Sequence, residues 1–199
     1  MDKKGSSKMS VNEENLGFLE PIFTKALEAR QNGDNTRAIE LFQNILRIEP
    51  RLPEPHLELA HIYLGLNQFE TARIHSDQAI EYLENGGQWI DTISEDDILS
   101  LAYTIKGEIH RVEADQDEVV LGDVEIWKRM LLLSQACYRK ALDLNPENED
   151  AKYYSRHYHW LTGTKQAEID QENQDQIETA TESYINNNKR FRRSEFLYQ

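Results

Sequence analysis

The chain has 199 residues, of which 22 are basic and 36 acidic, so its formal net charge is −14, and 39% of its residues are hydrophobic. This acidity argues against binding to nucleic-acid phosphates or anionic membranes, since both require a positive surface. The single cysteine, Cys137, excludes an intrachain disulfide and fits the reducing cytoplasm, and no apolar run approaches the roughly 18 residues that would cross a bilayer.

The polar composition of the first fifteen residues predicts a disordered tail over residues 1–15. Two segments that follow align at an offset of 34 residues, which places Ala38 on Ala72. In each segment, apolar residues recur at helical spacing on both sides of a short turn, at residues 31–34 and 65–68. Pro50 ends the first segment because proline cannot continue a helix. The pattern predicts two successive helical hairpins and an all-α repeat architecture.

A third and longer hairpin is predicted over residues 94–146. Its first helix starts after Ser94, which can cap the helix together with Asp97, and extends to Glu113. A loop over residues 114–122 leads to the second helix, which starts near Asp123. One stripe of this helix carries Trp127, Met130, Leu131, Ser134, Tyr138 and Ala141.

After Pro146, residues 150–161 are predicted to form a further helix that is rich in aromatic residues. Tyr154, His157, Tyr158 and Trp160 on this helix have two interpretations. We favour a capping helix that covers the last hairpin, and the alternative is an interface for a partner or a second copy.

Residues 164–199 are predicted to be a polar C-terminal helix or tail with a basic and aromatic end. Residues 186–199 carry four basic residues and one acidic residue, whereas residues 84–125 carry two basic and twelve acidic ones. We interpret the basic end as an arm that docks on an acidic surface of the same molecule. RNA binding is the weaker alternative, because the rest of the chain repels phosphate.

The hairpins resemble tetratricopeptide repeats over residues 16–163. That family has a small residue at position 8 of each 34-residue unit, Ala at 20, an aromatic residue at 24, a small residue at 27 and Pro at 32. The matching residues are Ala26, Ala38, Phe42 and Pro50 in the first unit, Ala60, Ala72 and Ala79 in the second, and Gly107, Tyr138, Ala141 and Pro146 in the third. Ser76 departs from the aromatic position, and Ile45 departs from the small position 27. The resemblance implies an all-α helix-turn-helix repeat solenoid.

The resemblance also implies that the first helices of the units line a concave groove, in which positions 2, 5, 9 and 12 contact peptides. The candidate groove residues are Glu20, Phe23, Leu27, Arg30, Glu54, Leu57, His61, Leu64, Thr104, Glu108 and Arg111. Some family members hold a peptide's C-terminal carboxylate at such positions with Lys, Asn and Arg. This chain has Phe23, Leu27, Leu57 and His61 at the matching places, so that clamp is not expected. The groove suits a basic or amphipathic segment, and the chain's own basic and aromatic end, residues 186–199, fits this description. The alternative is that the apolar residues of the groove pack between helices.

No catalytic site, metal site or cofactor is expected. The six histidines form no His-Glu-x-x-His motif, Cys137 is predicted to be a buried packing thiol, and the nine glycines form no phosphate loop. The predicted function is therefore a non-enzymatic, cytoplasmic scaffold or adaptor for a protein or peptide partner, with a chaperone-like protein as a narrower variant. The alternative is a self-associating structural assembly subunit, which leaves a homo-oligomer open.

Overall fold

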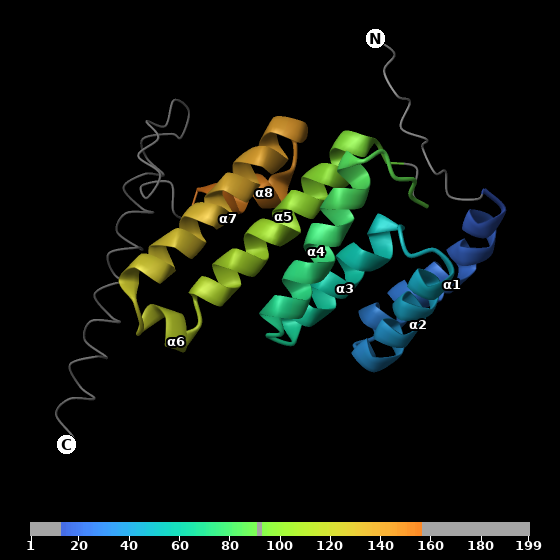
Figure 1. Cartoon of the computed structure of the whole chain (residues 1–199), viewed down its shortest axis with the longest axis horizontal. Helices are drawn as coiled ribbons and strands as arrows, with labels where there is room; N and C mark the ends of the chain where they lie inside the picture. Colours follow the sequence, from blue (N-terminus) through green and yellow to red (C-terminus); the bar gives the residue numbers. More distant parts are fainter. Residues whose placement is uncertain (1–12, 91–92, 157–199) are drawn as a thin grey trace, which may run out of the picture.

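The computed structural model describes residues 13–90 and 93–156, and every regular element within them is a helix. In chain order the helices are α1 (Glu13–Gln31), α2 (Asn35–Ile48), α3 (Pro53–Gly65), α4 (Phe69–Glu84), α5 (Glu95–Ala114), α6 (Asp117–Val120), α7 (Val124–Leu144) and α8 (Glu149–Ser155). They lie side by side in chain order, from α1 and α2 at one end to α7 and α8 at the other (Figure 1). The predicted all-α repeat architecture is confirmed.

Three hairpins make up the stack: α1–α2, α3–α4 and α5–α7. The turn of the first hairpin follows from its residues, since Gly33 has a φ of +77°, a left-handed conformation that glycine adopts without strain. The carboxylate of Asp34 then caps α2 by accepting a hydrogen bond from the backbone N–H of Arg37 at 3.0 Å. In the third hairpin, the predicted cap Ser94 accepts from the backbone N–H of Asp97 at 3.1 Å, and Asp123 caps α7.

The helices of each hairpin meet at small residues. Ala26, Ala38, Ala60 and Ala72, at positions 8 and 20 of the first two units, are all fully buried. In the third unit a Cβ on Gly107 would lie 2.7 Å from the ring of Tyr138, which is itself fully buried. Glycine at this position therefore lets α5 and α7 approach each other as closely as they do.

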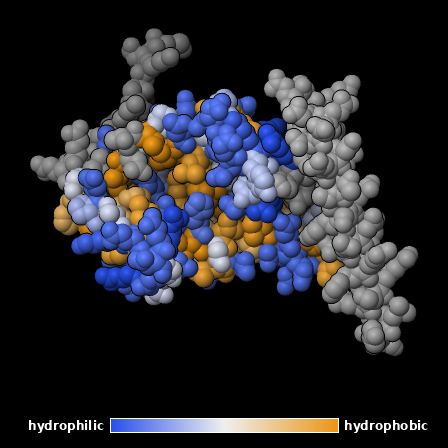
Figure 2. Space-filling view, turned by 180° about the vertical axis from the view of Figure 1, so that it is seen from behind, coloured by the Kyte–Doolittle hydropathy of each residue, from blue (hydrophilic) through white to orange (hydrophobic). Residues whose placement is uncertain are grey.

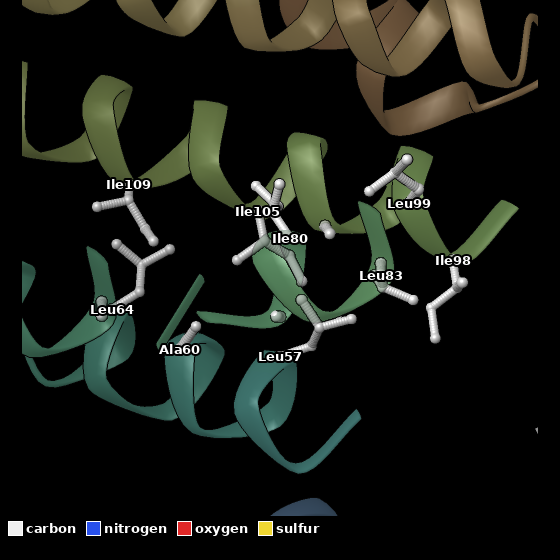
Figure 3. Close-up of a cluster of buried hydrophobic side chains, with 12 residues drawn as sticks. Leu57, Ala60, Leu64, Ile80, Leu83, Ile98, Leu99, Ile105 and Ile109 are labelled. Carbon is white, nitrogen blue, oxygen red and sulfur yellow. The ribbon is translucent and has the colours of Figure 1, made fainter. Parts of the chain in front are cut away.

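Neighbouring hairpins share a continuous core. Between α3, α4 and α5 the buried side chains interdigitate, as Figure 3 shows. The largest members of this cluster are Leu57, Leu64, Ile80, Leu83, Ile98, Leu99, Ile105 and Ile109. Burial of each such side chain contributes about 1.5–3 kcal/mol, so the stacking of hairpins supplies much of the stability that a single hairpin lacks.

Two boundaries differ from the sequence-based expectation. The predicted loop over residues 114–122 contains the short helix α6, which starts after Gln116 and ends before Gly122. Helix α1 starts at Glu13, inside the segment predicted as a tail. The remainder of that tail, the segment 164–199 and the predicted interface residues His157, Tyr158 and Trp160 lie outside the described residues.

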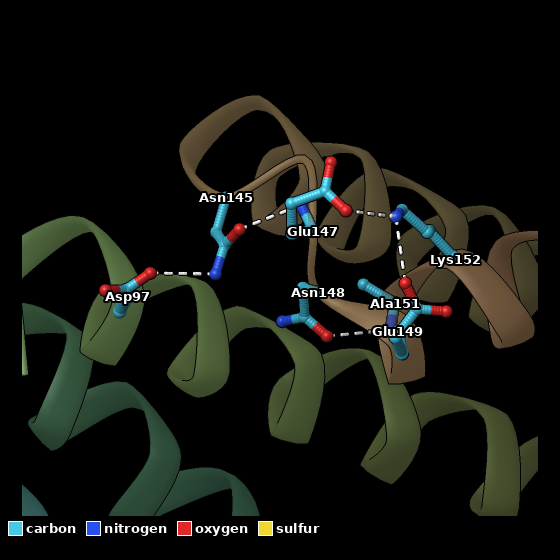
Figure 4. A network of polar contacts seen from close by, with 7 residues as sticks. All are labelled: Asp97, Asn145, Glu147, Asn148, Glu149, Ala151 and Lys152. Atoms are coloured by element: carbon cyan, nitrogen blue, oxygen red, sulfur yellow. Dashed lines mark hydrogen bonds and ion pairs between the residues drawn. The ribbon is translucent and has the colours of Figure 1, made fainter.

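The turn between α7 and α8 is fixed by side-chain amides (Figure 4). Asn145 donates to the carboxylate of Asp97 at 2.8 Å and accepts from the backbone N–H of Glu147 at 2.8 Å. Asn148 caps α8 through Ala151 and also donates to the hydroxyl oxygens of Ser100 at 2.8 Å and Thr104 at 2.9 Å. These bonds connect the start of α8 to α5 just beyond the C-terminal end of α7, so they fix the position of α8 at the end of the stack.

Candidate peptide-binding face

Four of the predicted groove residues lie inside the molecule. Phe23 is 5% exposed and packs edge-on against Phe42, and Leu57 and Leu64 belong to core clusters. Glu54 is 5% exposed, and its carboxylate accepts a hydrogen bond from the backbone N–H of Ile90 in the connection between α4 and α5. These side chains offer almost no surface to a peptide, because the neighbouring helix or connection covers them. For the apolar residues this matches the alternative interpretation, packing between helices.

Thr104 is buried as well. Its hydroxyl donates to the backbone carbonyl of Ser100 at 2.9 Å and accepts from Asn148, so its role is to hold α8. Leu27 is half-buried against the buried residues shared by α1, α2 and α3, and Glu20 is exposed on α1. The predicted residues that keep polar atoms at the surface and also contact one another are Arg30, His61, Glu108 and Arg111.

These four residues belong to a row of polar side chains that crosses the first helices of all the hairpins. We call it the polar track: Arg30 on α1, Glu58 and His61 on α3, Glu108 and Arg111 on α5, and Asp150 and Tyr154 on α8. Arg30 forms an ion pair with Glu58 at 2.7 Å, and its guanidinium lies 3.4 Å from Nδ1 of His61. Because the track links four helices, a single extended or helical segment lying along it would contact every hairpin.

On α5 and α8 the track continues around Arg111. Its guanidinium lies 4.7 Å from the ring centre of Tyr154, an attractive cation–π distance, and forms ion pairs with Asp115 at 3.2 Å and Glu108 at 3.8 Å. Tyr154 in turn stacks on the buried ring of Tyr138. Both arginines of the track are therefore already neutralised by carboxylates of the same face.

Burial changes the protonation of two groups on the track. It lowers the pKa of His61 to about 4, an effect that the charge of Arg30 reinforces and Asp150 opposes. Burial also raises the pKa of Glu108, against the influence of Arg111 and with that of Asp150. His61 is therefore neutral at physiological pH. With Arg30 and Arg111 as cations and Glu58, Glu108 and Asp150 as anions, the track carries two positive and three negative charges, a net charge of −1.

Sequence reasoning missed two members of the track. Glu58 is at position 6 of its unit, outside the ligand positions implied by the family resemblance, and it is half-buried beside Arg30. Asp150 lies in the first turn of α8, where an acidic residue is also favoured by the helix dipole, so its type alone carries no functional signal. Of the predicted interface residues, Tyr154 lies in the part of the chain that the structure describes, and it belongs to this face.

A pair of histidines, His56 on α3 and His75 on α4, lies between the two helices of the hairpin α3–α4. The Nδ1 atoms of His56 and His75 are 2.9 Å apart, and Nε2 of His56 lies 3.1 Å from the carbonyl oxygen of Pro50. Since a carbonyl only accepts, His56 donates from Nε2, and its Nδ1 accepts the hydrogen bond that His75 donates. The ring of His75 stacks on Tyr63 with 5.6 Å between the ring centres. Burial lowers the pKa of His75 to about 4 and also lowers that of His56.

The described residues contain no group of three His, Cys, Asp or Glu side chains that could hold a metal ion. Cys137 is 8% exposed, and burial raises the pKa of its thiol to about 11, as expected of a packing residue. In the part of the chain that the structure describes, no helix is long and apolar enough to cross a membrane.

Figure 2 shows one face of the molecule, on which hydrophobic surface gathers toward the middle between hydrophilic margins.

Comparison with known proteins agrees with the repeat architecture. The tetratricopeptide repeat family model matches residues 29–81. The first tetratricopeptide domain of Spaghetti (RPAP3), solved with the HSP90 peptide SRMEEVD, superposes with a TM-score of 0.55 at 16% identity, covering 78% of this chain and 99% of that domain. The tetratricopeptide domain of Arabidopsis OM64 superposes with a TM-score of 0.50 at 19% identity, covering 71% of this chain and 94% of that domain. No curated protein matches the chain significantly.

Proposed function

We propose that this tetratricopeptide-repeat protein is a non-enzymatic adaptor that binds a basic or amphipathic segment of a partner protein along the polar track. The repeat is in general a protein-interaction fold, and one structural neighbour of the chain is bound to a peptide. The reducing compartment inferred from the single cysteine supports a cytoplasmic location.

The observation that carries the proposal is the pairing of both track arginines. Arg30 is engaged by Glu58 at 2.7 Å, and Arg111 is engaged by Asp115 at 3.2 Å and by the ring of Tyr154. An acidic peptide would have to break these contacts to be bound by either arginine. Glu108 already pairs with Arg111 at 3.8 Å, whereas Asp150 is exposed, so a Lys or Arg of the partner can pair with Asp150 without displacing either arginine pair.

Specificity then differs from that expected for a carboxylate clamp. The neighbour of known structure binds a peptide that ends in Glu-Glu-Val-Asp. In this chain the face offers neutral His61 and paired arginines, so we propose selection by positive charge together with contacts to Tyr154 and Leu27. Each exposed ion pair contributes about 0.2–1 kcal/mol, so several weak contacts along the track would give a reversible interaction.

The test is a fluorescence anisotropy titration with three labelled peptides of equal length: an amphipathic peptide containing Lys and Leu, its acidic counterpart with Glu for Lys, and a peptide ending in Glu-Glu-Val-Asp. We expect the basic peptide to bind most tightly, and Asp150→Asn to weaken it by a factor of about two to five, because one ion pair is lost. The matched control is Glu81→Gln on α4, an exposed carboxylate away from the track. Tighter binding of either acidic peptide, or equal effects of the two substitutions, would contradict the proposal.

A further inference from the structure

The corner between α6 and α7 carries exposed apolar side chains and exposed acidic ones in one short segment of the chain. Leu121 is 45% exposed, Val124 55% and Ile126 40%. We call these three residues, together with Asp117, Glu118, Asp123 and Glu125, the α6–α7 corner. Large aliphatic side chains exposed this close together mark a surface where another segment can bury them.

The corner also lies in a densely acidic stretch of the chain. Residues 113–125 include six acidic residues and no basic one. Glu113 pairs with Arg73, Asp115 with Arg111 and Glu125 with Lys128, so these three carboxylates already have cationic partners. Asp117, Glu118 and Asp123 are exposed in the same short segment as the apolar residues. An occupant that is both apolar and basic would complement this surface.

We propose that the α6–α7 corner is the docking site for the chain's own C-terminal segment, residues 186–199. That segment carries four basic residues and one acidic residue, with Phe191, Phe196, Leu197 and Tyr198 among them. It is the most basic and aromatic end of an otherwise acidic chain, and its composition is the complement of the corner.

The course of the chain brings this segment within reach. Tyr154 stacks on Tyr138, and Gln135 lies 3.4 Å from the carbonyl oxygen of Tyr154, so α8 is antiparallel to α7 and points toward the start of α7. From Gln135 to Val124 the axis of α7 covers about 16 Å. Residues 157–185 supply 29 residues after α8. Even as a flexible coil they would span about 30 Å, which is enough to reach the corner.

The polar track is the less suitable place for the same segment. Of the apolar residues of the predicted groove, Phe23, Leu57 and Leu64 are buried and Leu27 is half-buried, so the track offers little apolar surface to four large side chains. The corner offers exposed aliphatic groups and exposed acidic ones. With the arm seated at the corner, the track remains open to a partner, so this docking and the proposed function are separate and can fail separately.

The test uses the full chain with Ser194→Cys carrying a nitroxide spin label, while Cys137 stays unlabelled because it is buried. We expect the label to broaden the NMR signals of Leu121, Val124 and Ile126, and the broadening to be independent of protein concentration. The double substitution Asp117→Lys and Glu118→Lys should lower the ratio of docked to undocked arm about ten-fold and restore these signals.

The matched control is Glu95→Lys with Asp96→Lys, which reverses two adjacent exposed acids in the first turn of α5. It makes the same charge change at an equivalent helix position, and it should leave the broadening intact. Three results would overturn the proposal: no broadening at the corner, broadening centred on the polar track, or broadening seen only between labelled and unlabelled molecules in a mixture, which would assign the arm to a second copy.

Discussion

Replacement of His75 by Asn tests the neutral histidine pair of the hairpin α3–α4. In the folded protein, His75 donates to Nδ1 of His56 and stacks on Tyr63. Asn places an N–H group near the same position and has no titratable proton. We therefore expect the substitution to weaken the fold modestly at pH 7, by about 1 kcal/mol, and to remove one source of acid sensitivity.

The magnitude follows from the pKa values of the two states. The pKa of His75 is about 4 in the folded protein, whereas an unperturbed histidine has a pKa of 6.5. Between these values the unfolded chain takes up a proton that the folded chain refuses, so stability falls as pH decreases from 6.5 toward 4 and changes no further below 4. From pH 7 to pH 5, this linkage alone would remove about 2 kcal/mol from the free energy of unfolding, and screening by solvent around the half-buried ring reduces this to about 1 kcal/mol.

The assay is urea unfolding at pH 7, 6 and 5, followed by circular dichroism. The wild-type chain should lose about 1 kcal/mol more than His75→Asn over this interval, because the substitution removes the proton uptake of His75 and leaves His56 as the remaining histidine of the pair. The control is Ile74→Ala, an exposed neighbour on the same helix, which should leave the pH dependence unchanged. Equal pH dependence of the wild-type and Asn variants, or an NMR titration of His75 with a midpoint near 6.5, would refute the reasoning.

Three further substitutions or reactions test the packing. Gly107→Ala should destabilise the fold by about 1–3 kcal/mol in thermal unfolding, because its Cβ would lie 2.7 Å from the ring of Tyr138. The control Gly17→Ala has open space around it and should be neutral or stabilising. Equal effects of the two substitutions would argue against the close contact. Asn148→Ala should lower the free energy of unfolding by about 2 kcal/mol and speed amide hydrogen exchange in α8. Unchanged exchange would show that Asn148 does not hold α8. The thiol of Cys137 should react with a thiol reagent far more slowly in the native than in the urea-unfolded protein, and fast native labelling would contradict its burial.

The sequence predicted the hairpins well because their signals are local. A 34-residue offset, small residues such as Ala26 and Ala38 where helices touch, and caps such as Ser94 are visible in the chain alone. Helix α6 was missed because a single helical turn of four residues leaves no periodic pattern to detect.

The candidate site was harder to predict. Positions 5 and 12 of a repeat face either an open groove or the next helix, and leucine or phenylalanine suits both environments. Phe23, Leu57 and Leu64 are buried because neighbouring helices cover them, which depends on packing angles that residue types do not encode. The pairing of Arg30 with Glu58 and the approach of Asp150 on α8 are tertiary contacts, which lie beyond what the repeat register alone predicts.

The hairpins differ in length, and this has a consequence for the way the molecule comes apart. Helices α5 and α7 contain 20 and 21 residues, whereas α3 and α4 contain 13 and 16. In a linear stack each hairpin depends on its own contacts and on its immediate neighbours, so the longest hairpin should be the last to open. The hairpin α1–α2, with a neighbour on only one side, should open first. Arg30 would then leave the polar track while α3, α5 and α8 still hold the rest of it. A segment bound along the track would therefore lose its contacts at the α1 end first.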